Sequence, residues 1–168
     1  MVQVVSAICP PFSTFYGYLG AACAIIFANL GSAYGCTVSG EGVCAIAPTN
    51  PSVVMKSTIP TIMAGILGIY GLIVAIIINS QIGENYTYYQ GFAHFSAGLM
   101  AGLSSLAAGI CIGIVGDAGV RKNARQPRLY VGMLLVLIFG EALALYGLIV
   151  GLIVATKSPS GGCTFTEI

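Results

Sequence analysis

The sequence has little charge and no Trp. Only 7% of its 168 residues are Asp, Glu, Lys or Arg, and 57% are hydrophobic. A soluble domain carries about 25% charged residues, so this chain has too few to cover a water-facing surface. The composition excludes a soluble globular protein and indicates an integral membrane protein, with no room for a separate soluble domain.

The sequence also lacks the patterns of an enzyme or a metalloprotein. It has no nucleophile–base pair, no metal-ligand spacing and no phosphate-binding loop, and its six cysteines match no zinc or redox motif. We expect no disulfide, cofactor, metal or nucleic-acid partner. The only histidine, His94, is expected to be packed or interfacial rather than a ligand. Asn85 begins a glycosylation sequon too close to the membrane for regular use.

What the chain does have is four long hydrophobic runs, at about 15–38, 59–80, 91–115 and 129–155. A membrane span needs about 20 apolar residues, and in lipid each span must satisfy its own backbone hydrogen bonds as a helix. The sequence therefore predicts an all-α membrane protein with four transmembrane helices.

Basic residues mark one side of the membrane. Five of the six lie in the expected loops 39–58 and 116–128: Lys56, Arg121, Lys122, Arg125 and Arg128. Because spans return the chain in pairs, both loops lie on the same side. The excess of Lys and Arg on cytosolic loops makes that side cytosolic, which places both termini on the lumenal side.

A single carboxylic acid, Glu141, lies in the middle of the fourth run. At about 1.5 Å per residue, Tyr130 lies about 17 Å before it and Ala155 about 21 Å after it, and the hydrocarbon core is about 30 Å thick. A charged acid at that depth costs at least about 2.5–3.5 kcal/mol. Burial thus favours the neutral form, and the group can take up and release a proton. The alternative is a polar contact that joins two helices.

Small residues form a stripe along each of the first and third spans, at gaps of three and four that place them on one helical face. Such stripes let helix backbones approach closely in lipid, and two nearly full-length stripes favour a crowded, curved assembly over a simple helix pair. The residues are Gly17, Gly20, Ala24, Ala28, Gly31 and Gly35 in the first, and Gly98, Gly102, Ser105, Gly109 and Gly113 in the third.

The chain repeats itself with a period of 76 residues. Over 62–78 against 138–154, 8 of 17 positions are identical, and small residues of the first span align with small residues of the third. The sequence therefore predicts two duplicated helical hairpins in the same orientation, at 1–80 and 81–168. Glu141 aligns with Gly65, so the first hairpin lacks the carboxylate.

Several segments, taken in order, resemble the proteolipid c-subunit of the vacuolar-type proton-pumping ATPase (V-ATPase). They are GSAYG at 31–35, MKS at 55–57, MAGI at 63–66, YGL at 70–72, GIVGDAGVR at 113–121, QPRL at 126–129, IFGEAL at 138–143 and LYGL at 145–148. The segment at 37–51 and the C-terminal tail depart from the family's usual form, but neither touches the acid.

The resemblance implies a rotor ring of proteolipid subunits in a vacuolar or other acidifying endomembrane. The first and third spans would line its inside, and Glu141 would face lipid on its outside. A stator subunit would present an arginine to Glu141, and central-stalk subunits would dock on the cytosolic loops. This chain would carry protons, while ATP is hydrolysed in other subunits.

The residues around the acid favour a proton over sodium. Sodium needs several oxygen ligands, and Ala64, Gly65 and Ile112 supply none. Tyr70 can either hydrogen-bond Glu141 or simply pack. Two other classes are less favoured: a pore needs more polar residues than span four has, and a purely structural proteolipid needs no acid at mid-span.

Overall fold

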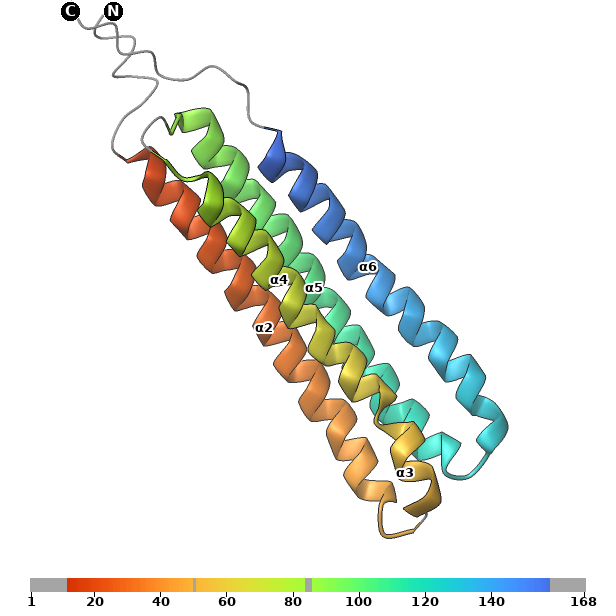
Figure 1. Cartoon of the computed structure of the whole chain (residues 1–168). Coiled ribbons are helices and arrows are strands. Elements are labelled where there is room, and N and C mark those ends of the chain that lie inside the picture. Colours follow the sequence, from red (N-terminus) through yellow and green to blue (C-terminus); the bar gives the residue numbers. More distant parts are fainter. Residues whose placement is uncertain (1–11, 50, 84–85, 158–168) are drawn as a thin grey trace, which may run out of the picture.

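The structure is a computed structural model that describes residues 12–49, 51–83 and 86–157. In these ranges it consists of helices alone, and four of them run side by side (Figure 1). Four helical segments are long and apolar enough to cross a membrane, which confirms the predicted all-α membrane fold. The elements are α2 (Ser13–Ile46), α3 (Pro51–Ser57), α4 (Ile59–Gln81), α5 (Tyr88–Asn123), the 3₁₀ helix η1 (Pro127–Leu129) and α6 (Tyr130–Thr156).

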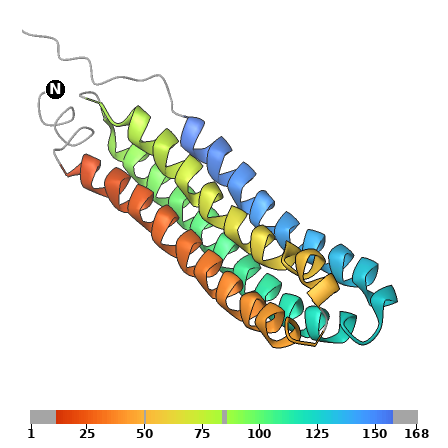
Figure 2. The ribbon, with the colours of Figure 1, turned by 60° about the horizontal axis from the view of Figure 1, so that its bottom comes forward.

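The helices form two neighbouring hairpins. The closest association is between α2 and α5, while α4 packs mainly on α2 and α6 mainly on α5, so that α4 and α6 meet less extensively. The α2–α3 and α5–α6 connections lie at one end of the bundle, and the start of α2 and the end of α6 lie at the other (Figure 2). The end with both connections carries the five bases of the predicted cytosolic loops.

Small residues explain why α2 and α5 approach so closely. All residues of both predicted stripes are buried. A Cβ atom added to Gly31 would lie 2.5 Å from the Cα of Leu106, and one added to Gly35 would lie 2.8 Å from the carbonyl oxygen of Gly109. Only glycine leaves room for a neighbouring backbone at these positions, so the predicted close helix contact is present.

The internal repeat is visible in the packing of each hairpin. Gly71 on α4 faces Ala24 on α2, and 76 residues later Gly147 on α6 faces Met100 on α5. Within each hairpin the same glycine meets the same position of the partner helix. The two halves are therefore copies in structure as well as in sequence.

The expected loop at 39–58 is wrong in extent. α2 continues to Ile46, and Pro51–Ser57 form α3. Gly42 extends the close contact with α5, where an added Cβ would lie 2.6 Å from Asp117 Oδ1. Ser39 is buried and bonds the Thr61 hydroxyl at 3.0 Å.

The third span also exceeds its predicted limits of 91–115. Thr87 and Gln90 form a capping box that starts α5, with each side chain bonded to the other's backbone N–H. At the far end the helix runs through most of the expected loop 116–128, as far as Asn123. The Arg121 Nε donates to Asp117 Oδ1 at 2.7 Å, one turn apart, so these charges extend the helix rather than break it.

Candidate functional site

Glu141 is the one buried carboxylic acid in the part of the chain that the structure describes. Its side of α6 packs against the first hairpin, and the residue is 9% exposed. The residues one turn before and after it, Leu137 and Ala144, are also buried. The helix thus carries one carboxylic acid into a buried contact.

Tyr70 provides a hydrogen bond to this acid from the neighbouring hairpin. Its hydroxyl donates to Glu141 Oε1 at 3.0 Å, across 71 residues of sequence. Sequence reasoning left this contact and simple packing equally open, and the structure contains the contact. A hydroxyl donor serves both charge states of a carboxyl group, and its bond is stronger when the acceptor is ionised.

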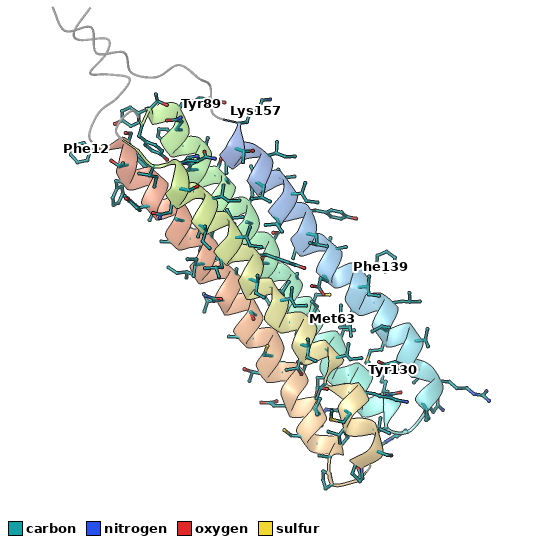
Figure 3. All side chains as sticks on the ribbon, viewed as in Figure 1. Phe12, Met63, Tyr89, Tyr130, Phe139 and Lys157 are labelled. Atoms are coloured by element: carbon teal, nitrogen blue, oxygen red, sulfur yellow. The ribbon has the colours of Figure 1, made fainter. Side chains whose placement is uncertain are left out.

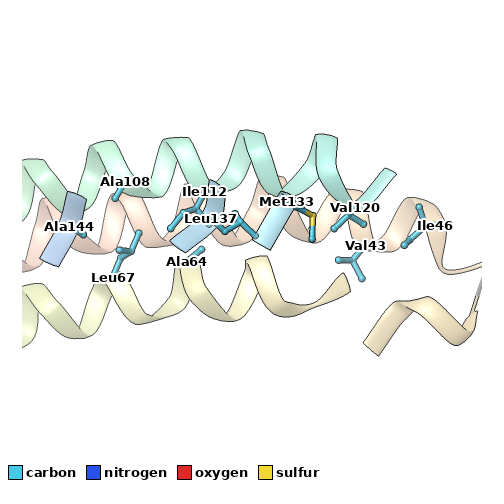
Figure 4. Close-up of a cluster of buried hydrophobic side chains, with 10 residues drawn as sticks. All are labelled: Val43, Ile46, Ala64, Leu67, Ala108, Ile112, Val120, Met133, Leu137 and Ala144. Carbon is cyan, nitrogen blue, oxygen red and sulfur yellow. The ribbon is translucent and has the colours of Figure 1, made fainter. Parts of the chain in front are cut away.

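The remaining surroundings of the acid are apolar. One buried cluster joins all four long helices and includes Ala64 and Leu67 from α4 with Leu137 and Ala144 from α6 (Figure 4). It contains Ile112 of α5 as well, whose Cγ1 lies 3.4 Å from where Gly140 would carry a Cβ. Tyr70 is thus the polar side chain that bonds Glu141, and the other walls around the acid are apolar.

Within this chain Glu141 is turned toward α4 and not toward the exposed face of α6. The exposed face of α6 is carried instead by residues such as Phe139, which is 74% exposed and projects away from the bundle (Figure 3). Glu141 lies on a different side of the helix, turned toward α4 because the Tyr70 hydroxyl binds it there. Which side of the helix holds the acid was not readable from its depth in the membrane.

The two small residues expected near the acid have separate places. Ala64 is fully buried in the cluster, and its Cβ lies 2.9 Å from where Gly35 would carry one. Gly65, the counterpart of Glu141, is exposed and has no atom within 4 Å of its Cβ position. It therefore does not contact Glu141 within this chain.

A second cluster of polar groups surrounds His94 at the opposite end of the bundle. The ring is 1% exposed, with Nδ1 2.6 Å from the Tyr86 hydroxyl and Nε2 3.1 Å from both Gln81 Oε1 and the Ala155 carbonyl oxygen. Because that carbonyl can only accept, Nε2 carries the hydrogen and Nδ1 accepts from Tyr86. The prediction of a packed histidine is confirmed.

Tyr86 belongs to the connection before α5, and its part in this cluster had no signal in the sequence. Burial raises the pKa of its hydroxyl to about 12, so it remains a donor at every physiological pH. No group of three or more His, Cys, Asp or Glu in the described ranges could hold a metal ion. The four described cysteines are unpaired.

A known protein family matches both hairpins of the chain. The family model for the ATP synthase C-subunit matches the chain twice, at residues 19–78 and 95–154. The second match begins and ends 76 residues after the first, which is the period of the repeat. The chain belongs to the ATP synthase C-subunit family.

Within that family, the chain is similar to subunits of V-type proton ATPases. The chain is 56% identical over 153 residues to the V-type proton ATPase 16 kDa proteolipid c-subunit of Nephrops norvegicus, covering 90% of this chain and 96% of that protein. It is 58% identical over 158 residues to the V-type proton ATPase 16 kDa proteolipid subunit of Chrysotila carterae, with the same coverage. The V-type proton ATPase c-subunit of Candida tropicalis is 49% identical over 153 residues, covering 91% and 96%. The resemblance found in the residues is confirmed.

Proposed function

We propose that this chain is a proton-carrying proteolipid in the membrane rotor ring of a vacuolar-type ATPase. The observation that carries the proposal is Glu141, a buried acid at mid-span that accepts a hydrogen bond from Tyr70. In the proposed cycle the acid carries its proton through the hydrocarbon between apolar walls. Close to a cation it ionises and releases its proton.

The cycle needs a partner that the chain itself does not supply. All six of its Lys and Arg residues lie near the helix ends, far from the depth of Glu141. We propose that a stator subunit presents an arginine at that depth, and that the acid leaves Tyr70 to meet it. Reprotonation from the opposite side then returns Glu141 to its site between α4 and α6.

Several copies of the chain, alone or with related proteolipids, would form the ring. α2 and α5 carry the small-residue stripes and their tight contact suits the crowded inner circle, whereas α4 and α6 suit the outer one. The transported ion is a proton, because Ala64, Gly65 and Ile112 offer no side-chain oxygens for sodium. ATP hydrolysis belongs to other subunits.

The basic end of the bundle sets the orientation. Lys56, Arg121, Lys122, Arg125 and Arg128 gather at the end with the two helix connections, and the positive-inside rule makes it cytosolic. Central-stalk subunits would dock there, and both termini would be lumenal. Such a subunit belongs in the vacuolar membrane or another acidifying endomembrane.

Labelling with a hydrophobic carbodiimide tests this proposal. The reagent partitions into lipid and reacts with protonated carboxyl groups, so it should modify Glu141 at neutral pH and do so faster as the pH falls. Asp117 is paired with Arg121 and Glu41 is exposed at the basic end, so both lie away from the depth of Glu141 and should react poorly with a reagent dissolved in lipid. Peptide mapping by mass spectrometry identifies the modified residue.

The fraction of pumping activity lost should exceed the fraction of copies labelled. Every site of a turning ring must pass the stator, so a few modified copies stop the whole rotor. Inhibition in proportion to labelling, or labelling spread over several acids, contradicts the proposal.

A further inference from the structure

The first hairpin has a bare groove on its free side. The groove runs between α2 and α4 at mid-span, has a volume of about 290 Å³, and is lined by residues that include Ile25, Asn29, Ser32, Gly65, Gly68 and Leu72. Asn29 is exposed there, and its amide has no hydrogen-bond partner within the described part of the chain. An amide exposed to hydrocarbon without a hydrogen bond costs free energy. We therefore expect the groove to bind a partner that supplies a polar group.

The internal repeat shows what covers such a groove. In the second hairpin, 76 residues later, six of the seven equivalent residues are buried, and the seventh, Leu145 (the counterpart of Ile69), is 37% exposed at the edge of the surface. The buried six are Ala101, Ser105, Ala108, Glu141, Ala144 and Leu148. This surface is covered by the first hairpin, whose Tyr70 binds Glu141. One copy of this surface is therefore occupied within the chain, and the other copy is empty.

The complementary face is also present and also empty. On α4, Leu67, Tyr70 and Val74 belong to the two buried clusters shared with the second hairpin. Their counterparts on α6, again 76 residues later, are Leu143, Tyr146 and Val150, which are 54%, 63% and 47% exposed. The chain thus ends in a groove on one side and in the face that fits it on the other.

We propose that a second copy of this chain docks the face of Leu143, Tyr146 and Val150 into the groove, and that its Tyr146 hydroxyl donates to the Asn29 amide oxygen. The proposal rests on the ring of the proposed function and adds the faces that meet. It also makes successive hairpin contacts differ: the contact within a chain holds an acid, and the contact between chains holds an amide.

Asn29 has the right place for this bond. Its Oδ1 lies 2.8 Å from where Gly68 would carry a Cβ, and Gly65 beside it leaves open space. In the second hairpin those two positions hold Ala144 and Glu141. The Asn29 amide thus fills part of the volume that the Glu141 carboxylate and the Ala144 methyl group fill in the second hairpin. Because Gly65 has no side chain to accept a hydrogen bond, the Asn29 amide oxygen is the acceptor for Tyr146.

A lipid chain is the alternative occupant of the groove. It would fill the volume but would leave both Asn29 and the Tyr146 hydroxyl without a hydrogen bond at mid-membrane depth. A copy of the same chain satisfies both groups at once, in a geometry that the fold already builds within itself. The second copy is therefore the favoured occupant.

Cross-linking in native membranes tests the docking, starting from a full-length chain whose own cysteines are replaced by serine. Tyr146→Cys with Gly65→Cys, treated with a short bismaleimide, should give dimers and a ladder of higher multimers. The matched pair Tyr70→Cys with Glu141→Cys should link within one chain and add no multimers. Exposed Ile73→Cys with Ile149→Cys serves as the off-face control and should give neither.

Single chains from the first pair, or multimers from the off-face pair alone, overturn the docking face. A lipid-filled groove gives the former result. Neither outcome changes the expected carbodiimide labelling of Glu141. The labelling experiment therefore tests the proton-carrier proposal independently of the docking.

Two further variants test the hydrogen bond itself. Tyr146→Phe and Asn29→Leu should each lower the fraction of multimers that survives in detergent about fivefold, the effect of one average hydrogen bond, and the double variant should add nothing. The pH profile of pumping should remain as in the parent. Full multimer survival in Tyr146→Phe, or additive losses in the double variant, overturns the bond.

Discussion

Replacing Gly31 with alanine should loosen the bundle although it adds a single methyl group. The new Cβ would lie 2.5 Å from the Cα of Leu106 and 2.7 Å from the carbonyl oxygen of Ser105, whereas carbon atoms pack at about 3.5–4.0 Å. Both neighbours are backbone atoms of α5 and cannot rotate away. The two helices must therefore separate by about 1 Å.

A gap of that size forfeits about a quarter to a half of each dispersion contact along the seam. Overpacking of this kind costs about 1–3 kcal/mol. Alanine also has a higher helix propensity than glycine, by about 1 kcal/mol. Any Gly→Ala change within a helix gains this amount. Gly132 is the matched control, because it is exposed on α6 with no atom within 4 Å of its Cβ position.

The assay is thermal stability of the purified chain in a mild detergent, measured as the fraction that stays monodisperse after heating. Gly132→Ala should be neutral or slightly stabilising. Gly31→Ala should be less stable than Gly132→Ala by about 1–3 kcal/mol, the packing cost alone, because the propensity gain is common to both. Equal stability of the two variants refutes the close approach of α2 and α5.

Two other changes separate proton handling from packing. Tyr70→Phe removes the hydroxyl that holds Glu141 between α4 and α6, so the pH dependence of pumping should change while the ring still forms; an unchanged profile assigns Tyr70 to packing. His94→Leu removes the ring that bonds the Tyr86 hydroxyl and the Ala155 carbonyl oxygen in the interior, and it should destabilise the chain by about 1–3 kcal/mol without moving the profile. If His94→Leu shifts the pH profile of pumping, the imidazole of His94 takes part in proton transfer instead.

The sequence predicted the second and fourth helices closely because their apolar runs end in polar residues. α4 ends at Gln81 and α6 at Thr156, each within one residue of the predicted end. The first and third helices were predicted too short. Gly40, Gly42 and Glu41 resemble a loop in sequence, and only contact with α5 shows that Gly42 continues the small-residue stripe.

The candidate site was predictable in depth but not in direction. Glu141 stood out because a lone acid in an apolar run is costly, and a count along the helix placed it at mid-span. Its turn toward Tyr70 depends on how two hairpins far apart in sequence pack together. Asn29 gave no signal at all, since its importance lies in a groove that exists only once α2 and α4 are in place.

The most direct test of the account is ATP-driven acidification of vesicles that carry Glu141→Gln. Glutamine has the size and polarity of the neutral acid and can still accept from Tyr70, so the complex should assemble normally, as judged by its amount in the membrane. It cannot release a proton, so acidification should be abolished, while Glu141→Asp should keep part of it. Acidification at the normal rate by the glutamine variant contradicts the claim that Glu141 carries the proton.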